Sequence, residues 1–320
     1  MKAIKKEVFN RLISSLIKRY EVIAPVKKEL VSFEVIKEPK EIFLEKNSYF
    51  PVKEFFFRKN ETLFEFKGNS VTVPVKKAKG KILLGLRRCD LNSILRQDMA
   101  FIDEEVDPYY KKERENSVLI GYHCKKAEDK YCFCGSLKLL DFFDLMLYDK
   151  GKRFIVEVGS KKGNEFINKH KQYFKNTNTS LTDKDKIIKN SDRLKKKDIS
   201  HLYNHPDWKK DVKLCLSCAA CNVLCPSCYC FDINDKVNIK DLSKGERFRT
   251  WAACQLRCFT KVAGEHVFRD KREERFKHRI YHQLQYFKEK HGVDLCTGCG
   301  RCIRGCPTRI DFVKTINEMK

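Results

Sequence analysis

Two cysteine runs with the same spacing constrain the fold of this chain more than any other feature. Each run reads C-x2-C-x2-C-x3-C-P, and the two comprise Cys215, Cys218, Cys221, Cys225 and Cys296, Cys299, Cys302, Cys306. Three closely spaced thiolates can cover one face of a small inorganic core, and a fourth ligand can come from a distant part of the chain. The runs therefore predict that segments far apart in the sequence meet around bound metal.

Zinc is the first alternative for closely spaced cysteines. Structural zinc sites use pairs of C-x2-4-C knuckles, whereas each run here has three cysteines and then C-P. That longer pattern is the ligand run of bacterial-type ferredoxins, in which the fourth cysteine serves the other of two [4Fe–4S] clusters. The sequence therefore predicts electron transfer through two interleaved clusters, one on Cys215, Cys218, Cys221 and Cys306 and the other on Cys296, Cys299, Cys302 and Cys225.

A net charge of +24 raises the question of nucleic-acid binding. The basic residues are spread along the chain in groups such as Lys76-Lys77 and Lys161-Lys162, and Asp or Glu usually lies nearby. This distribution is typical of a solvated lysine-rich surface, not of one basic patch. We therefore expect no nucleic-acid partner, although the excess positive charge would help the chain to bind an acidic partner protein.

The 16 cysteines bear on the cellular compartment. Free thiols and cluster ligands persist in a reducing environment, whereas an oxidising one would favour disulfides. Residues 1–18 carry apolar side chains at helical spacing interrupted by Arg11 and Lys18, which indicates an amphipathic helix and not a signal peptide. No stretch approaches the roughly 20 apolar residues that a membrane span needs. We expect a cytoplasmic protein without membrane contact.

Motifs for nucleotide cofactors are missing from the sequence. No G-x-G-x-x-G follows a predicted strand, no P-loop is present, and the eight histidines form no H-E-x-x-H pattern. We therefore predict no flavin, nicotinamide or ATP site and no catalytic residues. A chain that carries clusters but no substrate site needs partner subunits.

Residues 1–160 are predicted to form an α+β domain. After the N-terminal helix, short apolar runs indicate strands, and a helix is expected over 90–99. Asp149-Lys150-Gly151 indicates a hairpin turn. The predicted strands are 31–35, 55–57, 63–66, 71–75, 81–86, 117–122, 145–148 and 154–158.

Residues 161–210 are polar and charged, and we interpret them as a helical connector with helices at 164–175 and 182–197. Residues 211–320 form the predicted cluster domain. Between its two cysteine runs, Ser243 and Glu246 form a possible capping box for a helix through residue 262, and a second helix is expected over 271–290. The domain is therefore predicted to be an α-helical ferredoxin domain.

Four cysteines outside the runs suggest a third iron–sulfur cluster. Cys89 and Cys124 each follow a buried strand, so a sheet edge could bring them together, and Cys132 and Cys134 lie on the next loop. The alternative is four ordinary buried thiols, since free cysteine is often buried. The close C-x-C pair favours ligation.

The remaining cysteines are Cys228, Cys230, Cys254 and Cys258. They could form an accessory metal site or line one of the clusters, and the residue pattern alone favours the second interpretation. Cys221, Cys225 and Cys228 also match the C-x3-C-x2-C spacing of radical S-adenosylmethionine enzymes. That match is nested in a stronger motif, and no (β/α) repeat that could build a barrel accompanies it.

Several further motifs resemble the iron–sulfur β subunit of sulfhydrogenases, which are cytosolic nickel–iron hydrogenases, and the related iron–sulfur subunit of anaerobic sulfite reductase. The similar features extend nearly from end to end. They include the phenylalanine-rich segment 55–66, the segments 85–90 and 131–134, C-P-S-C-Y-C at 225–230, W-A-A-C at 251–254, the segment 263–269, and C-T-G-C-G-R-C at 296–302.

The resemblance implies an electron-transfer subunit of a multi-subunit oxidoreductase. In that family the subunit carries electrons between a flavoprotein that uses FAD and NAD(P)H and a catalytic metalloenzyme subunit. The latter is a hydrogenase in one branch and a sirohaem sulfite reductase in the other, and segment 55–66 favours the hydrogenase branch. Family members keep the cysteines that match Cys89, Cys124, Cys132, Cys134, Cys228, Cys230 and Cys254, whereas Cys258 departs from the pattern.

Overall fold

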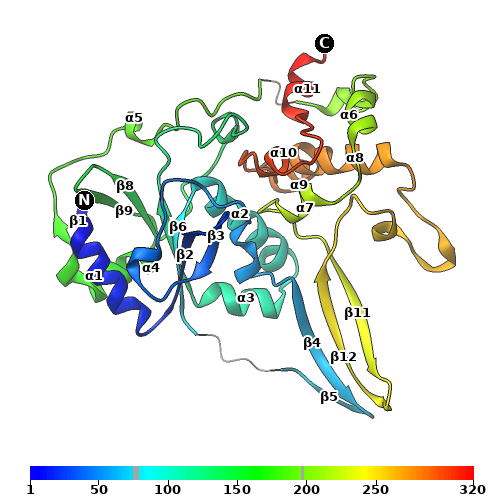
Figure 1. The fold of residues 1–320 in the computed structure, drawn as a ribbon, viewed down its shortest axis with the longest axis horizontal. Coiled ribbons are helices and arrows are strands. Elements are labelled where there is room, and N and C mark those ends of the chain that lie inside the picture. The colour runs from blue at the N-terminus through cyan, green and yellow to red at the C-terminus, as the bar shows by residue number, and fades with distance from the viewer. Residues whose placement is uncertain (75–78, 196–197) are drawn as a thin grey trace.

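The computed structural model describes residues 1–74, 79–195 and 198–320. It combines a mixed α/β part that contains the N-terminus, a helical part that contains the C-terminus, and a long antiparallel arm that projects from between them (Figure 1). Among the described residues, no helix is long and apolar enough to cross a membrane.

An eight-stranded mixed sheet organises the N-terminal part, with the order β10-β1-β9-β8-β7-β6-β2-β3. Its central strands β2, β6, β7 and β8 run parallel, and the outer pairs run antiparallel. The strands are β1 (Lys2–Lys5), β2 (Glu21–Lys27), β3 (Val31–Val35), β6 (Lys81–Leu86), β7 (Ser117–Tyr122), β8 (Leu145–Asp149), β9 (Arg153–Val158) and β10 (Lys175–Asn176). The strands predicted at 31–35, 81–86 and 117–122 and the hairpin around Gly151 are confirmed.

Helices cover both faces of this sheet, which explains why its central strands are almost wholly apolar. Alternate residues of β6 point to opposite sides, because Ile82 joins one buried core and Leu83 the other. The first core also contains the apolar faces of α1 (Lys6–Ile17) and α4 (Lys161–Lys169), and the second contains residues of α2 (Arg88–Asp98). The predicted N-terminal and 90–99 helices are thus confirmed, with α3 (Pro108–Glu115) in addition.

The antiparallel arm corrects one prediction. It consists of β4 (Asn60–Lys67), β5 (Ser70–Thr72), β11 (Phe231–Asn238) and β12 (Asp241–Trp251) in the order β11-β12-β4-β5. The predicted helix over 243–262 is wrong, since residues 243–251 belong to β12 and the remainder contains only the 3-10 turn Arg257–Thr260. Ser243 donates to Asp241, and Glu246 accepts from Thr62 of β4, so neither residue caps a helix. Pairing with distant strands overrides the local capping pattern.

Two smaller predictions are also wrong. Residues 55–57 are not a strand, because Val52–Phe55 forms a 3-10 turn that places Phe56 and Phe57 in the second core. Within the part of 182–197 that the structure describes, only α5 (Asp183–Lys186) is helical, and Leu194 packs into the C-terminal core. Residue 75 of the predicted strand 71–75 and residues 196–197 lie outside the described residues.

The C-terminal part has its own apolar core around the fully buried Trp208. Its helices are α6 (Trp208–Leu214), α7 (Ala220–Val223), α8 (Arg272–Tyr281), α9 (Phe287–His291), α10 (Arg301–Arg304) and α11 (Phe312–Glu318). The predicted helix over 271–290 is confirmed as α8 and α9 joined by a π-helical turn, His282–Tyr286, and it ends at Gly292. The domain boundaries at 160 and 210 stay a prediction.

Candidate metal centres

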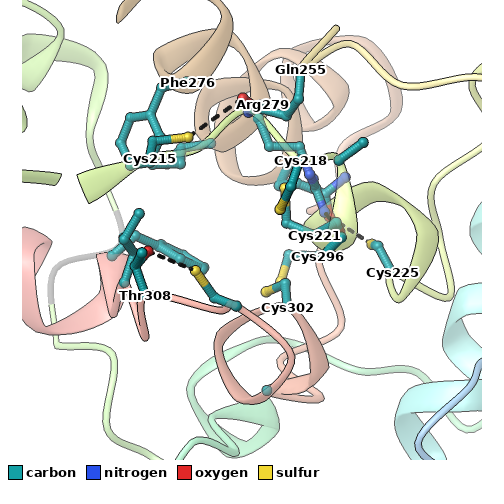
Figure 2. Close-up of a pocket in the computed structure, with 18 of the residues that line it drawn as sticks. Cys215, Cys218, Cys221, Cys225, Gln255, Phe276, Arg279, Cys296, Cys302 and Thr308 are labelled. Atoms are coloured by element: carbon teal, nitrogen blue, oxygen red, sulfur yellow. Dashed lines mark hydrogen bonds between the residues drawn. The ribbon is translucent and has the colours of Figure 1, made fainter. Parts of the chain in front are cut away.

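All eight cysteines of the two runs line one cavity (Figure 2). The cavity is partly open to solvent, and the space between its lining residues, including solvent at the opening, is about 940 Å³. A zinc ion holds its thiolates at about 2.3 Å and would leave no such hollow among them. The thiols therefore fit groups larger than a single ion, as the spacing of the runs predicts.

The two runs fold in the same local way. In each, the backbone N–H two residues after the first cysteine donates to that cysteine, from Ser217 to Cys215 and from Gly298 to Cys296, both at 3.4 Å. Ser217 and Ala219 have positive φ at the positions that Gly298 and Gly300 occupy in the second run. Non-glycine residues rarely adopt this conformation, and where they do it often marks a functional site. Matching short helices, α7 and α10, then follow and pack together.

Cys225, the fourth cysteine of the first run, lies beside the second run. Burial raises the pKa of Cys296, Cys299 and Cys302, and the nearby Cys225 raises all three further. Cys225 is therefore close to Cys296, Cys299 and Cys302, the three thiols with which it is predicted to share a cluster. Its Sγ also donates to Gln283 Oε1 at 3.6 Å, from the π-helical turn. π-Helical turns are frequent at functional sites.

The four N-terminal cysteines gather at the sheet edge that the sequence predicts. Cys89 lies in the first turn of α2, directly after β6, and Cys124 follows the neighbouring parallel strand β7. Burial raises the pKa of Cys89, Cys124 and Cys132, and Cys134 raises each of them further. Cys134 therefore lies close to the other three thiols. Metal binding would deprotonate such thiols and so link metal affinity to folding.

These four cysteines adjoin the second run. Cys299 contributes to the raised pKa of both Cys89 and Cys134, and burial is the larger cause in each case. Arg301, the first residue of α10 in the second run, pairs with Asp90 of α2 at 2.8 Å, and both side chains are fully buried. The Arg301 guanidinium also donates to the Ser48 carbonyl and to the Asn47 side chain. This buried network fixes the second run against the N-terminal domain.

Two glycines let the loop of the second run approach the 131–134 backbone. Gly298 has φ +65°, and its carbonyl accepts from the N–H of Phe133 at 2.8 Å. A Cβ at Gly298 would lie 2.5 Å from the Cys134 nitrogen, and one at Gly300 would lie 2.7 Å from the Tyr131 carbonyl carbon. Only glycine meets both the backbone conformation and the space at these positions.

We expect Gly298→Ala to lower the apparent melting temperature of the anaerobic protein much more than Gly264→Ala does. Gly264 is an exposed glycine with φ +76° and no atom within 4 Å of a built Cβ, so its substitution costs only the left-handed conformation, about 1–2 kcal/mol. Gly298→Ala adds a backbone clash and should cost about 3 kcal/mol or more. Equal shifts in the two variants, measured by thermal unfolding under argon, would contradict this packing.

The remaining cysteines separate into a group of three and one outlier. The side chain of Cys230 contacts those of Cys228 and Cys254, and Cys258 is exposed. Asn222 of α7 donates to Cys228 Sγ at 3.5 Å and to Cys254 Sγ at 3.2 Å, and its Oδ1 accepts from Cys221 at 3.6 Å. The group of three therefore adjoins the first run.

Some polar residues around these thiols were not predicted from the sequence. Lys53 and Arg279 are almost fully buried, and both lie close to several of the cysteines. Neither stands out in a chain with 67 basic residues, because spacing does not distinguish a buried lysine or arginine from an exposed one. Asn222 and Gln283 likewise belong to no recognisable motif.

Comparison with known proteins gives two matches. Residues 214–310 match the 4Fe-4S dicluster domain family, which spans both cysteine runs. The chain is also 32% identical to the Sulfhydrogenase 2 subunit beta of Pyrococcus furiosus over 335 aligned positions, which cover 98% of this chain and 95% of the relative. The comparison with solved structures finds no match.

Proposed function

This chain belongs to the family of sulfhydrogenase β subunits, and we propose that it carries electrons between two other subunits of an oxidoreductase complex. The main support for this proposal is that the eight cysteines of the two runs, all within the dicluster domain, line one cavity. Two [4Fe–4S] clusters there would accept and donate single electrons. The chain itself would position them, exclude water and offset their charge.

A third cluster, on Cys89, Cys124, Cys132 and Cys134, extends this proposed relay. Its support is the adjacency of these thiols to Cys299 of the second run. Arg87 and Arg88 lie nearby, since they lower the pKa of Cys124 and Cys134 respectively, against the larger effect of burial. Positive charge beside a cluster favours its reduced form. The relay would then lead from the C-terminal domain to the edge of the large sheet.

The proposed partners are a flavoprotein that uses FAD and NAD(P)H and a catalytic metalloenzyme subunit of the hydrogenase or sulfur-reductase type. Their support is the relative's name, which describes one component of a sulfhydrogenase. Cytoplasmic location is part of the same proposal. The iron–sulfur subunit of an anaerobic sulfite reductase is the alternative, and a sirohaem protein that copurifies with the chain would favour it. A remoter alternative is a nucleic-acid-binding protein with structural clusters.

We expect the isolated, reconstituted chain to exchange electrons with redox dyes but to leave NAD(P)H, hydrogen and sulfite unchanged. The reason is that clusters relay electrons while nucleotide and substrate sites belong to partners. The measurement is anaerobic spectrophotometry with each donor, before and after addition of a flavoprotein copurified with the native complex. Steady NAD(P)H oxidation by the flavin-free chain would contradict the proposal, and restored turnover with the flavoprotein would agree with it.

A further inference from the structure

The opening of the dicluster cavity lies beside the first cysteine run. Among the described residues that line the cavity, three are exposed, namely Leu216, Cys218 and Pro307, and the others are buried or half-buried. Leu216 and Cys218 belong to the first run, and Pro307 directly follows Cys306, the fourth predicted ligand of the same cluster. The opening therefore exposes the side of the cavity that holds the first predicted ligand set.

The second predicted ligand set lies deeper in the molecule. Cys225 and Cys299 are only 7% and 8% exposed, whereas Cys218 of the first set is exposed. The four N-terminal cysteines adjoin the second set through Cys299. Electron tunnelling slows steeply as the distance between two centres grows. A protein bound over the opening would therefore exchange electrons with a cluster on the first set, which is the outer end of the proposed relay.

The surface at the opening is apolar and carries positive charge. Leu214 and Leu216, on either side of Cys215, are 51% and 63% exposed. Lys213 and Arg309 are also exposed, and neither forms a salt bridge with a carboxylate in the part of the chain that the structure describes. An apolar centre with a polar rim is the usual composition of a protein–protein contact.

Single exposed leucines are common on protein surfaces and need no explanation. Here, however, two of them flank a predicted cluster ligand beside the opening of its cavity. Carboxylates of the neighbouring helices do not offset the positive charge, because Asp211 of α6 is buried and Glu318 of α11 pairs with Lys210 at 3.2 Å. The charge that complements this surface is therefore negative and belongs to another molecule.

We propose that the opening of the dicluster cavity is the docking surface for an acidic redox protein. Its apolar side chains would contact Leu214 and Leu216, and carboxylates at its rim would contact Lys213 and Arg309. Electrons would pass singly between its redox cofactor and the cluster on the first run, so that one centre is oxidised as the other is reduced. The inference rests on the proposed function and deepens it, because it gives one partner a place and a surface chemistry.

The first test measures binding, which requires no turnover. Contacts that pass electrons are small, often below about 1,200 Å², so a few side chains decide their affinity. Leu214→Gln with Leu216→Gln introduces no charge and should weaken binding of the reconstituted chain to one partner by about tenfold or more. The probes are the flavoprotein and the catalytic subunit of the native complex, each purified and immobilised separately.

The matched control for the double variant is Leu242→Gln. Leu242 is 76% exposed and begins the arm strand β12, whose tip projects away from α6 (Figure 1). This variant should bind both subunits as the wild-type chain does. Wild-type affinity of Leu214→Gln with Leu216→Gln for both subunits, at wild-type iron content, would overturn the proposal.

A second test changes a residue outside the cavity, so that it remains informative if the double variant loses iron. Lys213→Glu should slow association with the same subunit several-fold at low ionic strength, and high salt should abolish the difference. Lys240→Glu, in the exposed turn between β11 and β12, changes the net charge equally and is the control. Equal association rates of the two variants at every salt concentration would overturn the proposal.

These experiments separate the docking surface from the proposed function. If the wild-type chain exchanges electrons with neither subunit, the proposed function itself is wrong. If the wild-type chain does exchange electrons but the substitutions at Lys213, Leu214 and Leu216 leave binding unchanged, only the docking surface is wrong.

Discussion

The triple substitution Cys215→Ser, Cys218→Ser and Cys221→Ser is expected to remove one [4Fe–4S] cluster, about four irons per chain, and to leave Cys306 without metal. Cys225 lies beside Cys296, Cys299 and Cys302, and Cys306 lines the cavity that all the cysteines of the two runs share. In the interleaved arrangement, the fourth ligand of each cluster comes from the other run. The measurement is iron per folded chain after anaerobic reconstitution and size-exclusion chromatography.

A comparison of two quadruple variants tests the interleaving itself. Adding Cys306→Ser to the triple variant should remove no further iron, because its cluster is already lost. Adding Cys225→Ser should lower the iron content again, because that thiol belongs to the remaining cluster. The reverse result, with Cys306 needed and Cys225 dispensable, would show that each run binds its own cluster.

Cluster loss should also destabilise the C-terminal domain. The two runs are separated by the arm and by α8 and α9, so interleaved clusters would act as crosslinks between distant segments of the chain (Figure 1). Metal-binding free energy is folding free energy when the unfolded chain has no preformed site. The triple variant is therefore expected to unfold at a lower temperature than the wild-type protein.

The second large effect is expected in the N-terminal domain. Cys132→Ser with Cys134→Ser should remove about four irons per chain, because Cys134 lies near Cys89, Cys124 and Cys132 and would be a central ligand. Cys258→Ser serves as the exposed control. An unchanged iron content in the double variant would leave these four residues as ordinary buried thiols.

Electron paramagnetic resonance gives this experiment a second readout. Cys299 lies close to Cys89 and Cys134, so the third cluster would be adjacent to the cluster of the second run. In the fully reduced wild-type protein, two such neighbouring paramagnetic centres should interact and broaden their signals. The double variant should lose this interaction and show a simpler spectrum, whereas an unaltered spectrum would contradict the adjacency of two clusters.

Local patterns predicted much of the fold correctly because their causes are local. The apolar runs at 81–86 and 117–122 are long enough to form strands buried on both faces, and they do so in β6 and β7. The apolar face of α1 also follows directly from its helical spacing. Because parallel strands end at the same edge, the position of Cys89 and Cys124 after two buried strands predicted that they would lie together.

Predictions failed where distant parts of the chain compete with local preferences. Ser243 and Glu246 match a helix start, but Glu246 instead contacts Thr62 across the arm. Most side chains of β4 and β12 are exposed or half-buried, so neither strand has a continuous buried face. The two strands pair with each other although they lie about 180 residues apart in the sequence. Such pairing leaves no short-range pattern to recognise.

The two C-x2-C-x2-C-x3-C-P runs determine the cluster chemistry without any knowledge of the fold, because ligand type and spacing along a short loop are local properties. Which thiols meet across the molecule is decided by tertiary structure. Pairing in the β11–β12 hairpin places Cys230 close to Cys254. The close approach of Gly298 to the Cys134 backbone brings the dicluster domain against the N-terminal domain. The burial of Lys53 and Arg279 is decided in the same way, since the charge of a side chain does not reveal whether the folded chain will exclude water from it.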